Sequence, residues 1–240
     1  MLAKKISSLQ HPLVLYWAKL LKDRALRSKS HCCIITGEKL IRELSNRLVI
    51  KSLISTKETK TIPAENYFIA TEGILKKITG LASPDGYAAE ITLPSPQDLS
   101  SSKRLLVLDQ IQDPGNLGTL LRSAHALGWD GAVFTPGTVD PFNDKALRAA
   151  KGASFYLPFA IENRETIASW KHTHLIADIR GEPLGKSAFT SPIALILSSE
   201  GQGPNFWPNG KRIYIPMQSG VDSLNVASAG AILLYAMRPI

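Results

Sequence analysis

Three polar segments of this 240-residue chain hold the residues whose types could carry chemistry, and each follows a short apolar run. They span residues 113–122, 198–204 and 215–227. In an open α/β sheet, ligands bind at the carboxyl ends of the strands, in the loops that lead to the next element. The three segments are therefore candidates for one site.

The first segment combines a turn with the start of a helix. Residues 113–116, Asp-Pro-Gly-Asn, favour a turn, and Asn116 can cap the helix that follows. From Leu117 to Leu127, leucines and alanine recur at three- and four-residue spacing, which predicts a helix with one face on a sheet. Arg122 lies outside this apolar face. Asn116 and Arg122 are thus the polar groups available near the strand end.

The other two segments have a functional and a structural interpretation. Gly201 and Gly203 would let the backbone approach a ligand closely, beside a single acid, Glu200. Alternatively, the glycines only turn the chain and Glu200 caps a helix. In the third segment, Asp222 or Ser223 could cap the last helix. Each segment taken alone leaves both interpretations open.

Several common chemistries have no support in the sequence. No GxGxxG or GxxxxGK[ST] motif follows an expected strand, and no GxSxG elbow occurs. His172 and His174 lack a third metal ligand in sequence reach, so we expect no metal. Cys32 and Cys33 are adjacent and the only cysteines, which indicates buried strand residues.

Strands alternate with helices along most of the chain, which predicts an α/β fold with a parallel sheet. The expected strands are residues 31–36, 48–54, 67–70, 87–92, 105–108, 132–135, 157–161, 175–178, 193–197 and 213–215, and the expected helices 10–24, 38–45, 72–79, 117–127, 143–150, 164–171 and 225–237. Residues 93–103 concentrate Pro and Ser with few groups able to pack a core. We expect two domains, 1–95 and 104–240, with a linker at 96–103.

The net charge of +8 is concentrated at the amino terminus, where residues 1–30 hold seven Lys and Arg against one acid. Such a segment suits a protein that binds the phosphate backbone of a nucleic acid, although a solvated helix face explains one basic helix equally well. The candidate RNA contacts are Lys19, Lys22, Arg24, Arg27 and Lys29. No apolar run is long enough for a membrane span and no secretory signal is evident, so a cytoplasmic protein is expected.

Taken together, the segments DPGNLGTLLRSAHALG, LILSSEGQG and IPMQSGVDSLNVASA closely resemble, in order and spacing, those of the SpoU (TrmH) family of RNA ribose 2′-O-methyltransferases in the SPOUT superfamily. The resemblance covers essentially the whole chain. It implies a parallel-sheet SPOUT domain with a C-terminal trefoil knot, preceded by a small α/β RNA-binding domain, and normally a homodimer. Leu233 and Tyr235 of the last helix could serve that dimer or pack in the core.

The resemblance also implies the reaction, which is methylation of a ribose 2′-hydroxyl in rRNA or tRNA by S-adenosyl-L-methionine. The residues implied to bind this cofactor are Ser198, Ser199, Glu200, Gly201, Gly203, Ile215, Pro216, Met217, Leu224, Asn225 and Ala227. Main-chain groups would do most of the holding, which accounts for the glycines and for Pro216.

The family pattern implies a catalytic set of Asn116, Arg122, Glu200, Ser223 and Asn225. A guanidinium stays protonated in proteins, so the expected role of Arg122 is to stabilise the developing alkoxide and clamp the adjacent phosphate. Asn116 would orient Arg122 or the ribose. Glu200 would hold Arg122 or Asn225, and Asn225 with Ser223 would complete the pocket wall.

Three positions depart from the family pattern and affect the expected cofactor affinity. Ser198 replaces a usual Gly, which would cost about 1 kcal/mol or more if the position requires φ above zero. Ala227 and Ala150 replace usual Ser residues, and a lost hydrogen bond is worth roughly 0.5–1.5 kcal/mol. Two other functions remain open: a catalytically silent SPOUT-like RNA-binding protein acting in ribosome assembly, and a small-molecule α/β enzyme.

Overall fold

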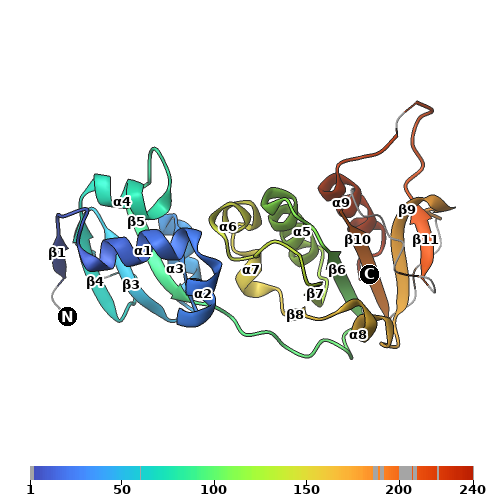
Figure 1. Cartoon of the computed structure of the whole chain (residues 1–240), viewed down its shortest axis with the longest axis horizontal. Coiled ribbons are helices and arrows are strands. Elements are labelled where there is room, and N and C mark those ends of the chain that lie inside the picture. Colours follow the sequence, from blue (N-terminus) through green and yellow to red (C-terminus); the bar gives the residue numbers. More distant parts are fainter. Residues whose placement is uncertain are drawn as a thin grey trace. The chain divides into compact units, whose positions relative to one another are not determined.

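The computed structural model describes residues 3–59, 61–185, 189, 192–199, 207, 210–220 and 222–239. The chain divides into two compact units, one formed by Met1–Pro94 with Phe142–Leu147 and the other by Ser95–Pro141 with Arg148–Ile240 (Figure 1). Each unit contains its own β-sheet. The predicted boundaries at residues 95 and 104 stay a prediction.

The first unit is built on a mixed five-stranded sheet in the order β1-β4-β3-β5-β2. Its elements are β1 (Lys4–Ile6), α1 (Pro12–Lys22), α2 (Arg24–Ser30), β2 (Cys32–Thr36), α3 (Glu38–Leu44), β3 (Ile50–Ser55), β4 (Asn66–Ala70), α4 (Glu72–Thr79) and β5 (Tyr87–Thr92). β4 runs parallel to β1 and β3, whereas β5 is antiparallel to β2 and β3. The helix predicted at 72–79 and the strand predicted at 87–92 have these bounds in the structure.

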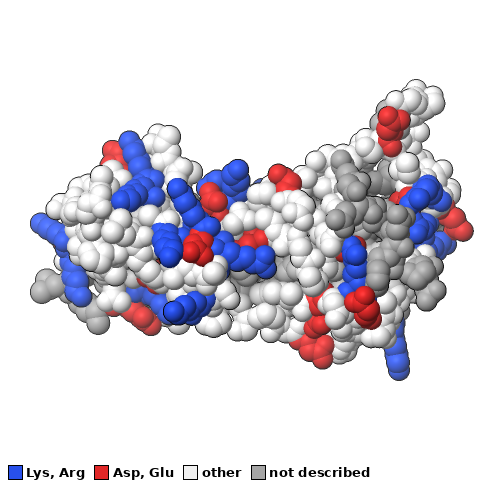
Figure 2. Space-filling model, in the orientation of Figure 1, with Lys and Arg blue, Asp and Glu red and all other residues white. Residues whose placement is uncertain are grey.

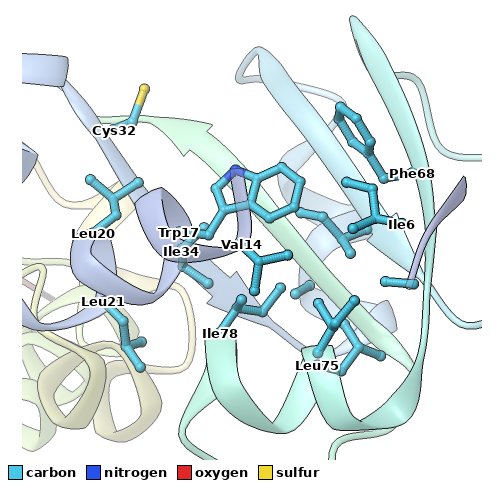
Figure 3. Close-up of a cluster of buried hydrophobic side chains, with 14 residues drawn as sticks. Ile6, Val14, Trp17, Leu20, Leu21, Cys32, Ile34, Phe68, Leu75 and Ile78 are labelled. Atoms are coloured by element: carbon cyan, nitrogen blue, oxygen red, sulfur yellow. The ribbon is translucent and has the colours of Figure 1, made fainter. Parts of the chain in front are cut away.

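Helices α1 and α4 supply most of the core on one face of this sheet. Figure 3 shows Val14 and Trp17 of α1 facing Leu75 and Ile78 of α4, all of them buried. The Trp17 ring meets the Phe68 ring of β4 edge-on, with centroids 5.1 Å apart. The apolar stripe of the basic helix is therefore a packing surface, which leaves its charged residues for solvent.

The second unit is built on a parallel six-stranded sheet in the order β11-β9-β10-β6-β7-β8, which confirms the predicted sheet type. Its strands are β6 (Arg104–Asp109), β7 (Gly131–Phe134), β8 (Phe159–Ile161), β9 (Thr173–Pro183), β10 (Ile193–Ser198) and β11 (Lys211–Tyr214). The remaining helices of the chain are α5 (Pro114–Ala126), α6 (Asp144–Ala150), α7 (Ala153–Tyr156), α8 (Arg164–Ala168) and α9 (Val226–Ala236).

The two faces of the parallel sheet bury different partners because side chains alternate along each strand. Leu105, Val107 and Ile196 pack with Ile167 of α8 and with Trp207 on one face. On the other face α9 lies against α5 and β10. A Cβ at Gly230 of α9 would stand 2.2 Å from Leu120 of α5, so glycine is required for this close approach.

The structure corrects several expectations about the elements. Strand β1 and helix α7 were not expected, because three or four residues show too little periodicity to be recognised. Leu99 of the expected linker is 4% exposed and packs in the core of the second unit, so this segment is partly docked. The single basic helix expected at 10–24 is interrupted at Asp23. Helix α1 ends at Lys22, and Asp23 caps the start of the next helix, α2.

Candidate active site

The described parts of the three polar segments start from one edge of the parallel sheet. Strands β6 and β10 are neighbours, and their last residues, Asp109 and Ser198, are paired in register. Strand β11 runs in the same direction and ends at Tyr214. The segments that follow these strands therefore start from the same edge, as the sequence predicts.

A cavity of about 220 Å³ opens at this edge. It is lined by the middle of β9, the ends of β10 and β11, the segment after β11 and one side of α9: Ala177, Asp178, Ile179, Leu197, Ser198, Ser199, Ile213, Tyr214, Ile215, Met217, Ser223, Leu224, Val226, Ala229 and Leu233. Six of the predicted site residues are in this lining, namely Ser198, Ser199, Ile215, Met217, Ser223 and Leu224. Pro216, Asn225 and Ala227 adjoin these positions in the chain but are not part of the lining.

The amino termini of α5 and α9 are joined by a side-chain hydrogen bond. Asn225 Nδ2 donates to Asn116 Oδ1 at 3.1 Å, between residues 109 positions apart in the chain. Both residues were predicted in the catalytic set, and the structure brings them into contact. Asn116 lies in the first turn of α5 and Asn225 directly precedes α9, so the bond connects the starts of the two helices. Asn225 follows the cavity residues Ser223 and Leu224 in the chain.

The predicted helix caps are wrong, and the reason is local chemistry. Asp113, not Asn116, caps α5, since its Oδ1 accepts from the Asn116 backbone N at 2.7 Å. Pro114 occupies the first helical position, where its missing N–H costs nothing, so the helix starts earlier than predicted. Asn225, not Asp222 or Ser223, caps α9 through Oδ1, which accepts from the Ala227 N at 2.9 Å.

Arg122 is an exposed residue of α5, and it is not part of the cavity lining. No residue in the described part of the chain makes a hydrogen bond or ion pair with its guanidinium, whose five N–H groups are all donors. Glu200, its predicted partner, lies outside the described residues, as do Gly201 and Gly203. The predicted pairing of Arg122 with Glu200 therefore stays a prediction.

Ser198 is the last residue of β10, and its φ is not positive. The condition under which a serine here would be strained is therefore not met at Ser198. Its hydroxyl instead donates to Asp109 Oδ2 at 3.2 Å. Ala227 is 7% exposed beneath the Asn225 cap, and Ala150 is buried.

Asp178 is a charged group on the cavity wall that the sequence analysis missed. Its side chain is 4% exposed and forms ion pairs with Arg180, at 3.0 Å, and with Arg212. Burial by itself would raise the pKa of Asp178, but the hydrogen bonds from the two guanidinium groups outweigh burial and lower it. The position could have been found from the sequence, because it ends an expected strand as Asp109 does.

The candidate RNA contacts on the basic helices divide into four exposed residues and one buried residue. Lys19, Lys22, Arg24 and Lys29 are exposed, and Figure 2 shows Lys and Arg side chains over the face that carries α1 and α2. Arg27 is 3% exposed, and its Nη1 donates to the carbonyl oxygens of Leu20 and Leu21 at 2.8 and 3.0 Å. The prediction that Arg27 contacts RNA is wrong, because its charge holds the end of α1.

Other predicted features have plain structural outcomes. Cys32 and Cys33 are buried strand residues, as predicted. Leu233 is buried under α9, whereas Tyr235 is 57% exposed. Within the described ranges, no three His, Cys, Asp or Glu residues gather in a way that could hold a metal ion. No helix in the same part of the chain has both the length and the apolar character to cross a membrane.

Known proteins resemble this chain in sequence across both units. Residues 103–235 match the model of the SpoU rRNA Methylase family. The chain is 32% identical over 249 residues to the 23S rRNA (guanosine(2553)-2′-O)-methyltransferase RlmP of Bacillus subtilis, covering 98% of this chain and 99% of that protein. It is 35% identical over 188 residues to a Synechocystis protein described as an uncharacterized tRNA/rRNA methyltransferase, covering 72% of this chain and 67% of that protein.

Solved structures resemble it over nearly the whole length as well. The AdoMet-bound rRNA methyltransferase from Sinorhizobium meliloti matches with a TM-score of 0.85 and 25% identity, covering 98% of this chain and 97% of that one. An RNA methyltransferase of the TrmH family from Porphyromonas gingivalis, described as putative, matches with a TM-score of 0.83 and 27% identity, covering 96% and 98%. The likeness therefore extends beyond the residues of the family match.

Proposed function

The chain belongs to the SpoU rRNA methylase family, and on this premise we propose that it transfers a methyl group from S-adenosyl-L-methionine to a ribose 2′-hydroxyl of ribosomal or transfer RNA. The observation that carries the proposal is the contact between Asn116 and Asn225 beside the cavity. It joins two of the three segments on which the resemblance rests, while Ser198 and Ser199 of the second segment line the same cavity.

The cavity fits the cofactor by its chemistry. Leu197, Ile213 and Leu224 offer apolar walls suited to an adenine ring, and the Asp178 carboxylate lies on the same lining as a hydrogen-bond acceptor. When bound, S-adenosyl-L-methionine supplies an electrophilic methyl group on a sulfonium. The residues that would hold it are Ser198, Ser199, Ile215, Met217 and Leu224, with Pro216, Asn225 and Ala227 adjoining, and with Glu200, Gly201 and Gly203 from the predicted set.

The protein's part in the reaction is to position the ribose and stabilise its oxygen. A 2′-hydroxyl is a weak nucleophile until its proton is leaving, so donors near that oxygen lower the barrier. Arg122 offers a planar set of exposed donors that can bind a phosphate and the developing alkoxide together. Asn116, held by Asn225, would orient the ribose, and Ser223 and Glu200 would complete the set.

RNA binding is assigned to the first unit, and several coarser expectations extend the proposal. The exposed cations of α1 and α2 would neutralise phosphates. Ile232 and Tyr235 on α9 are 43% and 57% exposed and would pack in a homodimer. Strand β11 lies at the edge of the sheet, and the chain then leads back to α9, which packs against α5. This return of the last segment supports the proposal of a trefoil knot. An RNA substrate of this kind would place the enzyme in the cytoplasm.

Large-subunit ribosomal RNA is the first substrate to test, because the relative that aligns over nearly both full lengths is named for 23S rRNA. Purified protein would be incubated with methyl-labelled S-adenosyl-L-methionine and with rRNA or tRNA from cells that lack the gene. A 2′-O-methyl group blocks alkaline cleavage of the next phosphodiester, so the product is mapped as an uncleaved position. We expect label at one such position in one RNA.

A catalytically silent RNA-binding protein gives a different result in the same experiment. It would bind RNA with a steep salt dependence but transfer no label and give no heat on titration with S-adenosyl-L-methionine. A small-molecule enzyme would show no salt-dependent RNA affinity. Label on a base, or on no RNA at all despite cofactor binding, would contradict the proposed function.

A further inference from the structure

We propose that Asp109 is a positioning residue for the methyl donor, and that it acts by holding Ser198, a residue of the cavity lining, against the end of β6. Asp109 is 1% exposed at the last position of β6, and it was not among the predicted site residues. This inference rests on the proposed function, since it concerns affinity for S-adenosyl-L-methionine.

The Asp109 carboxylate accepts four hydrogen bonds, two on each oxygen. Oδ1 accepts from Thr135 Oγ1 and from Arg164 Nε, both at 2.9 Å. Oδ2 accepts from Ser198 Oγ at 3.2 Å and from Trp207 Nε1 at 3.1 Å. A buried charge is costly unless it is paired and fully hydrogen-bonded, and here Arg164 supplies the countercharge. The two oxygens therefore have separate partners.

One of the two Oδ2 donors, Ser198, belongs to the cofactor cavity. Ser198 and Ser199 line the cavity, and the Ser199 backbone N also donates to the Asp109 carbonyl oxygen at 3.2 Å. The other donor, Trp207, is 3% exposed in the sheet core, and its ring lies beside the His174 ring with centroids 6.1 Å apart. Asp109 Oδ2 thus joins a residue of the cavity wall to a residue of the rigid core.

The Oδ1 side serves the sheet and not the cavity. Thr135 follows β7, Arg164 begins α8, and neither residue is part of the cavity lining. This asymmetry makes the proposal testable. Weakening the Oδ2 bonds should lower cofactor affinity, whereas weakening the Oδ1 bonds should affect stability alone.

Asp109→Asn separates the two sides within one residue. An asparagine amide has one acceptor oxygen, and the Arg164 cation would keep that oxygen as its partner. The NH2 group of the amide would then face Ser198 and Trp207, whose donors would lose their acceptor. We expect the Kd and KM for S-adenosyl-L-methionine to rise about tenfold, as the loss of about two hydrogen bonds predicts, with kcat little changed at saturation. A purely structural role would instead lower the active fraction and leave KM unchanged.

Single-donor variants keep the proposal testable if Asp109→Asn does not fold. Ser198→Ala and Trp207→Phe each remove one Oδ2 donor, and each should raise the Kd about three- to tenfold in calorimetric titration. Thr135→Val is the matched control, because it removes an Oδ1 donor while the Gln110 backbone N keeps Thr138 Oγ1 as a partner at 3.1 Å. Its Kd should stay at the wild-type value.

Tryptophan fluorescence gives a readout independent of turnover. The chain has four tryptophans, so the difference between the emission spectra of wild type and Trp207→Phe gives the contribution of Trp207. Asp109→Asn should change the Trp207 contribution and leave the emission of the other three tryptophans unchanged. A wild-type Kd in Asp109→Asn and Ser198→Ala, or an equal rise in Thr135→Val, would overturn the positioning role alone. Failure of the wild-type protein to bind S-adenosyl-L-methionine would overturn the proposed function as well.

Discussion

Arg122 and Asp178 illustrate two ways in which a charged residue can serve a site. Arg122 is exposed and has no partner among the described residues, so its donors are free for a ligand. Asp178 is almost fully buried on the cavity wall and is neutralised by two guanidinium groups. Arg122 can serve a ligand because its donors are exposed, and Asp178 can be buried only because it is paired.

Replacing Arg122 tests the proposed phosphate and alkoxide clamp. Arg122→Lys keeps the charge but loses the planar, bidentate donor set, so we expect kcat/KM for RNA to fall by a factor on the order of 10²–10³. Arg122→Ala should fall at least as far. Methyl transfer to rRNA measures this, and unchanged binding of S-adenosyl-L-methionine by calorimetry is the control. Near-full activity of Arg122→Lys would rule out the clamp.

The lowered pKa of Asp178 predicts a specific acid response. The unfolded carboxyl titrates near about pH 3.9, and the folded group titrates lower, so the unfolded state binds more protons between the two values. The contribution of Asp178 to stability is therefore complete above about pH 4 and is lost as the pH falls through the folded pKa.

Urea unfolding at several pH values compares wild type with Asp178→Asn. The wild-type free energy of unfolding should fall more steeply than that of the variant below about pH 4, and the two slopes should agree above it. Asp85→Asn offers a control acid in the first unit. Parallel curves for wild type and Asp178→Asn across this window would contradict the assignment.

At the scale of elements, α5 and α9 depend on side chains that cap one helix and contact the other. Asn225 caps α9 through Oδ1 and donates to Asn116 of α5 through Nδ2. One amide thus stabilises a helix start and fixes the position of a second helix start. Its two functions lie on different atoms, so substitution can separate them.

Asn225→Asp should keep the cap, because aspartate is an equally good N-cap, but it loses the donor to Asn116. We expect its thermal stability to stay near wild type while methyl transfer falls about tenfold or more, since the ribose-orienting amide is no longer held. Asn225→Ala should lose both functions and destabilise the protein by about 1 kcal/mol. Thermal unfolding and initial rates measured on the same preparations distinguish these outcomes. Equal activity of wild type and Asn225→Asp would show that the contact is structural only.

On the scale of the whole molecule, charge is distributed unevenly between the amino-terminal segment and the rest. The net charge is +8, and residues 1–30 carry six of these charges. The exposed cations on α1 and α2 are Lys19, Lys22, Arg24 and Lys29, whereas Arg27 is buried. Phosphate contacts by such residues supply affinity but little sequence preference.

Replacing these four exposed cations with Gln should weaken RNA binding and flatten its salt dependence. Each lost phosphate contact reduces the slope of log K against log salt by roughly 0.7–0.9. Filter binding between 50 and 300 mM salt measures the slope. Gln at Lys39, Lys57, Lys103 and Lys171 removes the same charge from other exposed positions and should change the slope less. Equal effects of the two sets would show that only net charge matters.

The sequence by itself determined the local elements and the candidate segments. The bounds of α4 and β5, the parallel sheet and the positions of Asn116, Ser198 and Asn225 after strands or before helices follow from periodicity and turn chemistry, which act over a few residues. Short-range signals also misplaced the caps of α5 and α9, because the residues that cap them, Asp113 and Asn225, have neighbours that are equally good caps.

Only the tertiary structure decided which polar groups meet. The Asn116–Asn225 bond joins residues 109 positions apart, the four donors of Asp109 come from residues 26 to 98 positions away, and Arg27 is buried because α2 packs against the end of α1. Such pairings depend on strand order and helix packing, which local periodicity does not encode. Burial makes the pairings of Asp109 and Arg27 obligatory, since a polar group withdrawn from water must find its partner inside the protein.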